Sequence, residues 1–180
     1  IVNTKSKEFD YPKGDENVYA TYQGKGGVKI DSFLKRLFFA FKFNSLNLFL
    51  SNDVTTNSRI LYHRNIKERV KKIVPFLTLD RDPYVVVANK KIYWIYDAYT
   101  KTDNYPYSQP QTLNGESINY IRNSVKIVID AYDGSINFYQ VDMKDPIIQT
   151  YAKIFPNLFR PMSKMPINLI SHLRYPEDIF

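Results

Sequence analysis

The chain has 180 residues, of which 44% are hydrophobic and 16% aromatic, so it can bury a core and lies outside the composition of disordered proteins. It has no cysteine and only two histidines, which excludes disulfides, thiol catalysis and cysteine metal sites and argues against a zinc site built on histidines. The net charge of +7 arises in the first half, where residues 1–90 hold 16 Lys and Arg against 9 Asp and Glu, while residues 91–180 hold 9 of each. This asymmetry indicates an acidic partner or an anionic surface facing one side of the molecule.

Residues from about 31 to 78 are predicted to be helical, after thirty residues of extended chain and turns. Asp31 or Ser32 can cap a first helix, whose buried stripe at i, i+3, i+4, i+7 spacing would be Leu34, Leu37, Phe38 and Phe41. After a polar connection, a second helix is expected from about Arg59 to Leu77. Its apolar face would be Tyr62, Ile66, Val70, Ile73, Val74 and Leu77.

The second helix also carries a cluster of cations, with Glu68 as its one acid. The candidate contacts with an anionic surface are Arg64, Lys67, Arg69, Lys71 and Lys72. They could be a solvated face, a face paired with acids elsewhere in a longer chain, or a surface for anionic lipid or an anionic wall polymer. Because neither helix-turn-helix spacing nor an aromatic RNA-binding signature accompanies them, no nucleic-acid partner is expected.

Two β-hairpins are predicted between about residues 84 and 141. The runs 84–88 and 92–98 flank a short connection in which Asn89 suits a positive φ, and the runs 125–132 and 135–141 flank Asp133-Gly134, a strong hairpin signal. A loop of about 25 residues, rich in Tyr, Pro, Gln and Asn, joins the hairpins.

The end of the chain, from about 145 to 173, is predicted to be helical again. Asp145 and Pro146 are typical of a helix start, and residues 167–173 indicate a further short helix. Without strict alternation of strands and helices, the pattern favours an α+β fold, with an antiparallel sheet of two hairpins flanked by amphipathic helices. Residues 1–180 are expected to form a single domain or a segment of a larger one.

Several long motifs occur in an order that resembles uncharacterised protein family 0182, large bacterial integral-membrane proteins. They are "EFDYPKGDENVY" (8–19), "GKGGV" (24–28), "SRILYHRNIKERVKKIVPFL" (58–77), "YWIYDAYTKTDNYPYS" (93–108), "NYIRNSVKIVIDAYDGSINFY" (119–139), "DPIIQTYAKIFPNLF" (145–159) and "HLRYPEDIF" (172–180).

The resemblance implies several N-terminal transmembrane helices followed by a large soluble region outside the cytoplasm. This chain, which lacks an initiator Met, would be a segment of that region in a multi-pass protein of the cell membrane. Its partner would be the remainder of the same polypeptide, including the transmembrane helices. The resemblance carries over no catalytic, metal or cofactor-binding residues, and we expect no cofactor.

Asp97 and Asp130 close similar runs, "WIYDAY" and "IVIDAY", and raise the question of a catalytic carboxylate pair. Acid–base chemistry of the glycosidase kind needs the two carboxyl groups within about 5–10 Å of each other. If the two strands are antiparallel neighbours, the acids lie at opposite ends, about 20 Å apart. We therefore favour strand ends that bond to local backbone.

Two loops resemble ligand sites only faintly. Residues 130–137 have oxygen ligands but lack the alternate acids and final Glu of a calcium loop, so the hairpin turn is favoured. Residues 24–29, "GKGGVK", lack the second Gly-Lys-Ser/Thr of a phosphate-binding loop, which favours a flexible loop.

The long loop between the hairpins could stack sugars or peptides through the rings of Tyr99, Tyr105 and Tyr107. Packing of these rings onto the domain is the alternative. For the whole chain we expect a binding or structural module of the cell envelope. An envelope enzyme whose site is completed by other sequence, and an electrostatic docking surface, are the competing hypotheses.

Overall fold

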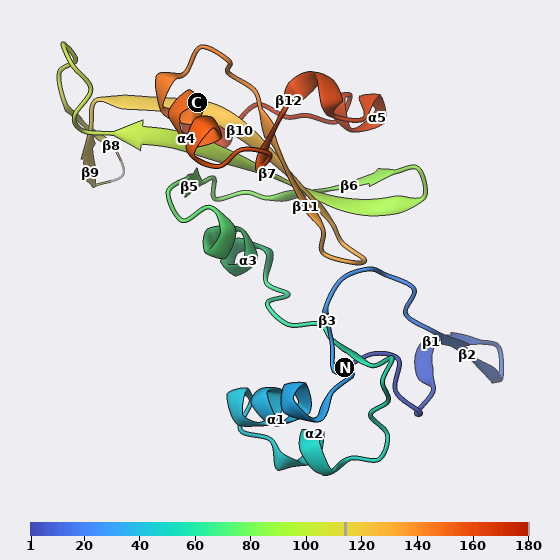
Figure 1. Cartoon of the computed structure of the whole chain (residues 1–180). Coiled ribbons are helices and arrows are strands. Elements are labelled where there is room, and N and C mark those ends of the chain that lie inside the picture. The colour runs from blue at the N-terminus through green and yellow to red at the C-terminus, as the bar shows by residue number, and fades with distance from the viewer. Residues whose placement is uncertain (114, 180) are drawn as a thin grey trace. The chain divides into compact units, whose positions relative to one another are not determined.

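The computed structural model describes residues 1–113 and 115–179 and divides the chain into two compact units, residues 1–64 and residues 65–180 (Figure 1). Each unit has its own apolar core. The expectation of a single domain, or of a segment of a larger one, stays a prediction.

Unit 1 is built from two small hairpins of strands and a pair of short helices. Its elements are β1 (Glu8–Lys13), β2 (Glu16–Ala20), β3 (Val28–Lys29), α1 (Phe33–Lys42), α2 (Leu46–Leu50) and β4 (Arg59–Ile60). β1 pairs with β2, and β3 pairs with β4, both antiparallel. A small core of Ile30, Val54 and Ile60 lies against Phe39 of α1 and Leu48 of α2.

Unit 2 is built around a sheet with the strand order β12-β11-β10-β7-β5, in which β6 also pairs with β7. Its strands are β5 (Thr78–Leu79), β6 (Tyr84–Ala88), β7 (Lys91–Thr102), β8 (Gln111–Leu113), β9 (Glu116–Ile118), β10 (Tyr120–Asp130), β11 (Ile136–Gln140) and β12 (Phe159–Pro161). Its helices are α3 (Ile66–Ile73), α4 (Pro146–Ile154), η1 (Met162–Lys164), α5 (Ile167–Ile170) and η2 (Glu177–Ile179).

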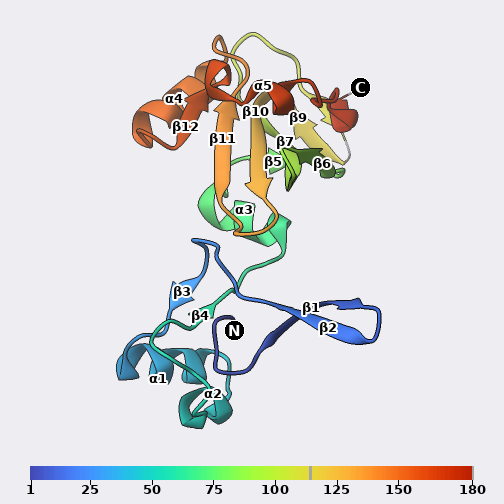
Figure 2. The same ribbon diagram turned by 90° about the vertical axis from the view of Figure 1, so that its right-hand side faces the viewer.

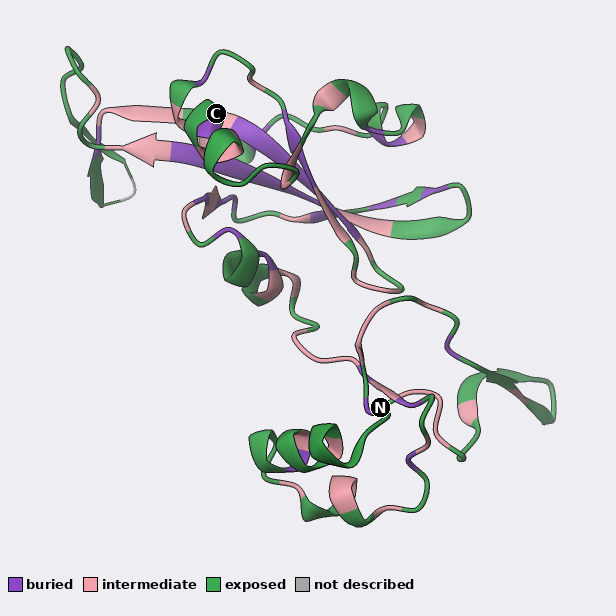
Figure 3. Cartoon of the chain, viewed as in Figure 1, coloured by how far each residue is buried: buried purple, intermediate pink, exposed green. Residues whose placement is uncertain are grey.

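Both faces of this sheet are covered, as the views in Figures 1 and 2 indicate. On one face, Val70 of α3 and Ile148 of α4 pack with alternate residues of β7 and β10. On the other, Leu169 of α5 packs with Ile95 and Val128. Because a strand buried on both faces needs apolar side chains at successive positions, β7 and β10 read as nearly continuous apolar runs. In Figure 3 their central parts are buried.

The α+β fold class and both predicted hairpins are confirmed. Asn89 and Lys90 between β6 and β7 have φ angles of 50° and 61°, the left-handed values that a two-residue hairpin turn requires. Between β10 and β11, Gly134 has a φ of +71°, and a Cβ atom there would lie 2.9 Å from the guanidinium of Arg69. This position therefore favours glycine for its backbone angle, whereas the Arg69 side chain could move to make space.

Two of the predicted helix starts are also confirmed. The Ser32 side chain accepts a hydrogen bond from the backbone N–H of Lys35 and caps α1. Asp145 accepts one from the N–H of Ile147 and caps α4, whose first residue is Pro146. Both caps satisfy N–H groups that have no partner within the helix.

The predicted helix from Arg59 to Leu77 is wrong at both ends. Residues 59–60 form β4, His63 has a φ of 52°, and α3 begins only after Asn65, whose side chain accepts from the N–H of Glu68. The helix ends at Ile73 because Pro75 disfavours helical backbone at the residue before it.

The predicted burial of the α1 stripe is also wrong. Leu34, Leu37, Phe38 and Phe41 are all exposed, whereas Ala40 and Phe39 on another side of the helix meet the unit 1 core. The spacing was correct for an amphipathic helix, but Phe39 made the helix apolar on more than one side.

The sheet is larger than two hairpins. The hairpins join through antiparallel β7 and β10, and β12 adds a parallel strand beside β11. The hairpins β1–β2 and β8–β9 were not predicted, because their pairing depends on short polar runs without clear alternation.

A matched pair of substitutions in α4 tests this packing. Ile148→Ala should lower the free energy of unfolding by about 2–5 kcal/mol, because the Ile148 side chain is fully buried. Ile154→Ala, on the same helix but 58% exposed, should change it by less than about 0.5 kcal/mol. Chemical denaturation measures both, and equal effects would contradict the placement of α4.

Candidate functional site

The polar groups inside unit 2 gather along the central pair of strands, β7 and β10. Asp97 of β7 lies opposite Lys126 of β10, and the two form an ion pair with both side chains buried. Asn123 donates to Asp97 Oδ1 at 2.9 Å, and Lys126 Nζ donates to the backbone oxygen of Arg174 at 3.0 Å. Burial raises the pKa of Asp97, while Lys126 and Asn123 favour its ionised form.

A second buried carboxylate, Asp80, lies on the same side of the sheet. It accepts the hydroxyl hydrogen of Tyr99 and the backbone N–H groups of Asp82 at 2.9 Å and Asp178 at 3.3 Å. Burial raises the pKa of Asp80, but these hydrogen bonds outweigh it and hold the pKa below its usual value. Burial and the Asp80 charge together raise the pKa of Tyr99.

Asp80 and its neighbours fasten the last residues of the chain to the sheet. Asp178 of η2 accepts from the backbone N–H and the guanidinium of Arg81. The N–H of Arg174 donates to the Tyr84 hydroxyl at 3.1 Å, and the Arg174 guanidinium lies 4.6 Å from the centre of that ring. With the Lys126 bond, these contacts hold residues 174–178 against β6, β7 and β10.

A β-bulge in β10 supplies side chains to both faces of the sheet. Arg122 pairs with Thr100 and Val125 with Ala98, so that Asn123 and Ser124 together oppose the single residue Tyr99. Asn123 reaches Asp97 on one face, whereas Ser124 donates to Asp145 on the other.

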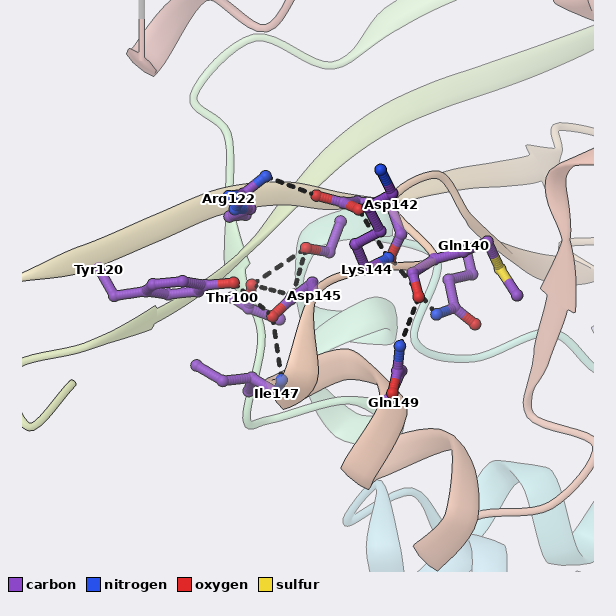
Figure 4. A network of polar contacts seen from close by, with 11 residues as sticks. Thr100, Tyr120, Arg122, Gln140, Asp142, Lys144, Asp145, Ile147 and Gln149 are labelled. Carbon is purple, nitrogen blue, oxygen red and sulfur yellow. Dashed lines mark hydrogen bonds and ion pairs between the residues drawn. The ribbon is translucent and has the colours of Figure 1, made fainter. Parts of the chain in front are cut away.

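Asp145 is the centre of this second polar cluster (Figure 4). Its carboxylate accepts hydroxyl hydrogens from Thr100 at 2.5 Å, from Tyr120 at 2.7 Å and from Ser124, as well as the N–H of Ile147 at 2.9 Å. Burial raises the pKa of Asp145, but these donors together hold it below its usual value. Burial and Asp145 raise the pKa of Tyr120.

These arrangements connect elements that are far apart in sequence. Asp80 and Asp145 each accept hydrogen bonds from at least two other parts of the chain, and Asp97 accepts from two residues of β10. These hydrogen bonds hold all three carboxylates in place, and they keep the pKa values of Asp80 and Asp145 below the usual value, which suits a structural role. Within residues 1–113 and 115–179, no group of three or more His, Cys, Asp or Glu could hold a metal ion.

The structure places Asp97 and Asp130 on antiparallel neighbouring strands. Asp130 lies opposite Tyr93, four positions from Asp97 along β7, or about 13 Å at the usual rise of a strand. Asp97 does not end its strand as we predicted, because β7 continues to Thr102. Asp130 accepts the N–H groups of Tyr132 and Asp133, the local turn bonding expected for it.

The "GKGGVK" stretch is organised around one arginine. Arg59 donates to the carbonyl oxygens of Lys25, Gly26 and Gly27 at 2.9–3.2 Å. The loop presents carbonyl groups to a cation of its own chain, an arrangement opposite to that of a phosphate-binding loop.

The predicted cationic residues differ in their surroundings. Lys67, Lys71 and Lys72 are exposed on α3, whereas Arg69 is half-buried beside the β10–β11 turn, where it favours ionisation of Asp133. Arg64 is exposed and belongs to unit 1. Contact of these residues with an anionic surface stays a prediction.

The predicted stacking tyrosines are separated as well. Tyr99 is buried in β7, so its ring is not available to a ligand. Tyr105 stacks on Tyr120 with ring centres 4.4 Å apart, and Tyr107 is fully exposed. Tyr99 continues the apolar run of β7, which is buried at every position from Ile95 to Thr100, and this run could have placed Tyr99 in the strand.

Comparison with known proteins relates the whole chain to a family. The sequence model of a family described as "Uncharacterised protein family (UPF0182)" matches residues 1–180. The chain is similar to UPF0182 proteins of Pelotomaculum thermopropionicum, with 55% identity over 180 residues, and of Desulforamulus reducens, with 57% over 181 residues. Each alignment covers 100% of this chain and 19% of the relative, so the chain spans about a fifth of these relatives' length. No solved structure matches it.

Replacing Asp145 should change how stability depends on pH. Because the folded pKa lies below the ordinary value of 3.8, ionised Asp145 stabilises the fold above that pH, and the stabilisation is lost as the pH falls toward the folded pKa. Asp145→Asn should cost about 1–3 kcal/mol at neutral pH. The difference between the two proteins should shrink below about pH 4, as measured by urea unfolding across pH. A difference that stays constant down to pH 2 would contradict ionisation of Asp145 in the fold.

Removing one charge of the buried pair should destabilise unit 2 strongly. Lys126→Met should cost about 3–5 kcal/mol, because it leaves Asp97 buried without its cation. The double variant with Asp97→Leu should recover most of this loss, since neither charge is then buried alone. A double-mutant cycle in guanidinium measures the coupling, and simple additivity would show that the pair does not act as a unit.

Proposed function

We propose that this chain, which belongs to the uncharacterised protein family UPF0182, is a non-catalytic interaction module within a larger membrane-bound polypeptide. Its similarity to relatives about five times its length supports a place in a longer chain. The resemblance to integral-membrane proteins supports a position in the extracytoplasmic region of a multi-pass protein of the cell envelope. Among the described residues, no helix is long and apolar enough to cross a membrane.

The exposure of the β1–β2 hairpin is the observation that supports this proposal most directly. All but two of its residues are exposed, including Phe9, Tyr11 and Tyr19 (Figure 3). An isolated two-stranded hairpin with little buried surface is marginally stable in water. Its unpaired strand edges and aromatic side chains are suited to a partner that adds a strand or covers a face.

The remainder of the same polypeptide is the partner that we propose for this hairpin. A covalently linked surface is present at high effective concentration, so a small contact area is sufficient to order the hairpin. The hydrogen-bonded carboxylates of unit 2 also suit an interaction module, because they stabilise a rigid sheet.

Hydrogen exchange can test this proposal on a full-length relative. The full-length Pelotomaculum thermopropionicum protein in detergent would be compared with its segment that aligns with this chain. Amides aligned with residues 8–20 should exchange at least about tenfold more slowly in the full-length protein, because a partner surface suppresses local opening.

Amides aligned with residues 125–129 serve as the internal control. They lie in the buried part of β10 and should exchange slowly in both proteins. Equally fast exchange of the hairpin amides in the segment and in the full-length protein would contradict the proposal.

A further inference from the structure

The two helices of unit 1 expose large apolar side chains, of which Leu34, Leu37, Phe38 and Phe41 share one side of α1. This surface, here called the apolar helix face, consists of Phe33, Leu34, Leu37, Phe38, Phe41, Leu46 and Leu50. Phe38 is 70% exposed and Phe41 is 89% exposed, and α1 and α2 are largely exposed in Figure 3. Soluble surfaces tolerate scattered apolar residues, but a contiguous group marks a binding surface.

Apart from Phe33, the apolar helix face does not take part in the contacts described for the core of unit 1. Phe39 and Leu48 pack on the unit core, and Ala40 of α1 is buried. The rings of Phe33 and Phe49 meet edge to face, with centres 5.1 Å apart, and join α1 to α2. The core of unit 1 is therefore formed by other side chains, and the apolar helix face is available to an external partner.

The charges around this face favour an anionic partner. Residues 31–53 contain three cations, Lys35, Arg36 and Lys42, and two acids, Asp31 and Asp53, which stand at the two ends of the stretch. Arg36 donates to the carbonyl oxygens of Ile30 and Val54 and so belongs to the unit. Lys35 and Lys42 precede and follow Phe38 by three and four residues, which places both beside its ring on the helix surface.

Both lysines are free enough to reach an external anion. Lys35 pairs with Asp31 at 2.7 Å, but both side chains are exposed, and such pairs exchange readily for other partners. Lys42 lies 4.6 Å from the centre of the Tyr62 ring. Long lysine stems can remain on apolar surface while the ammonium group reaches a more polar layer.

We propose that the apolar helix face docks on the surface of an anionic lipid bilayer. The Phe and Leu side chains enter the boundary between headgroups and acyl chains, and Lys35 and Lys42 meet lipid phosphates. This combination of aromatic and leucine residues with flanking lysines suits helices that lie in the membrane interface. The core of a protein–protein interface, by contrast, is depleted of lysine.

Vesicle sedimentation with the chain of residues 1–180 tests the proposal. The chain should bind vesicles of equal parts phosphatidylcholine and phosphatidylglycerol at least about tenfold more tightly than vesicles of phosphatidylcholine alone. Phe38→Ser with Phe41→Ser should weaken binding to the anionic vesicles by at least about tenfold, through loss of buried apolar area. Lys35→Gln with Lys42→Gln should weaken it by about fivefold for each lysine.

Two matched variants away from the face are the controls. Ile167→Ser removes an apolar side chain of α5 that is 84% exposed, and Lys67→Gln with Lys71→Gln removes two exposed lysines of α3. Both should leave binding within about twofold of the unchanged chain, since surface substitutions have little effect elsewhere. Circular dichroism would verify that each variant is folded.

Three outcomes would overturn the proposal. They are absence of binding to the anionic vesicles, unchanged binding by the phenylalanine variant, and a loss with the α3 lysine variant as large as that with the α1 lysine variant. Protection of residues 33–50 from hydrogen exchange in a lipid-free full-length relative, together with absence of vesicle binding, would assign the face to a protein partner instead. The vesicle-binding results do not depend on the hydrogen exchange at residues 8–20 that tests the proposed function, so the two proposals can fail separately.

Discussion

The buried ion pair between Asp97 and Lys126 constrains the rest of unit 2. Removing two charges from water costs several kcal/mol for each, so the pair persists only where its geometry and additional hydrogen bonds compensate. Asn123 and the backbone oxygen of Arg174 supply those bonds. A shift of β10 by one residue would turn Lys126 toward the opposite, apolar face. The pair therefore disfavours the wrong register of the central strands and brings the end of the chain to the sheet.

Local signals allowed much of the fold to be predicted. Asn89, Asp133-Gly134 and Asp145-Pro146 act through their own backbone preferences, so the hairpins and the α4 start are where we expected them. The two ends of α3 could also have been predicted from local residues, because Asn65 caps its start and Pro75 follows its end. We gave more weight to the apolar spacing of residues 59–77. The packing of α1 was less accessible, because Phe39 and Phe41 have the same chemical character and only tertiary contacts distinguish their surroundings.

The polar clusters could not be predicted in this way, because they depend on register between distant strands. Asp97 and Tyr99 were visible as a candidate carboxylate and a candidate stacking ring, but their partners Lys126 and Asp80 come from other strands or their ends. Asp145 was recognised as a helix cap, while its bonds to Thr100, Tyr120 and Ser124 were not, because the bulge that brings Ser124 to it has no clear sequence signal. The Asp145 cluster joins α4 to β7 and β10, whereas the predicted cap involves only the first turn of α4.

The bulge at Asn123–Ser124 has a consequence for how the length of this chain can vary in evolution. Deleting either residue would restore simple alternation and leave both flanks of β10 in register with β7, because Arg122 and Val125 already lie opposite Thr100 and Ala98. The deletion would instead remove the hydrogen bond of Asn123 to Asp97 or that of Ser124 to Asp145. Changes of length are easily accommodated at exposed hairpin turns, but loss of a single residue here would leave one buried carboxylate with one donor fewer. Substitution can therefore exchange one donor for another at this bulge, whereas a deletion removes the donor altogether.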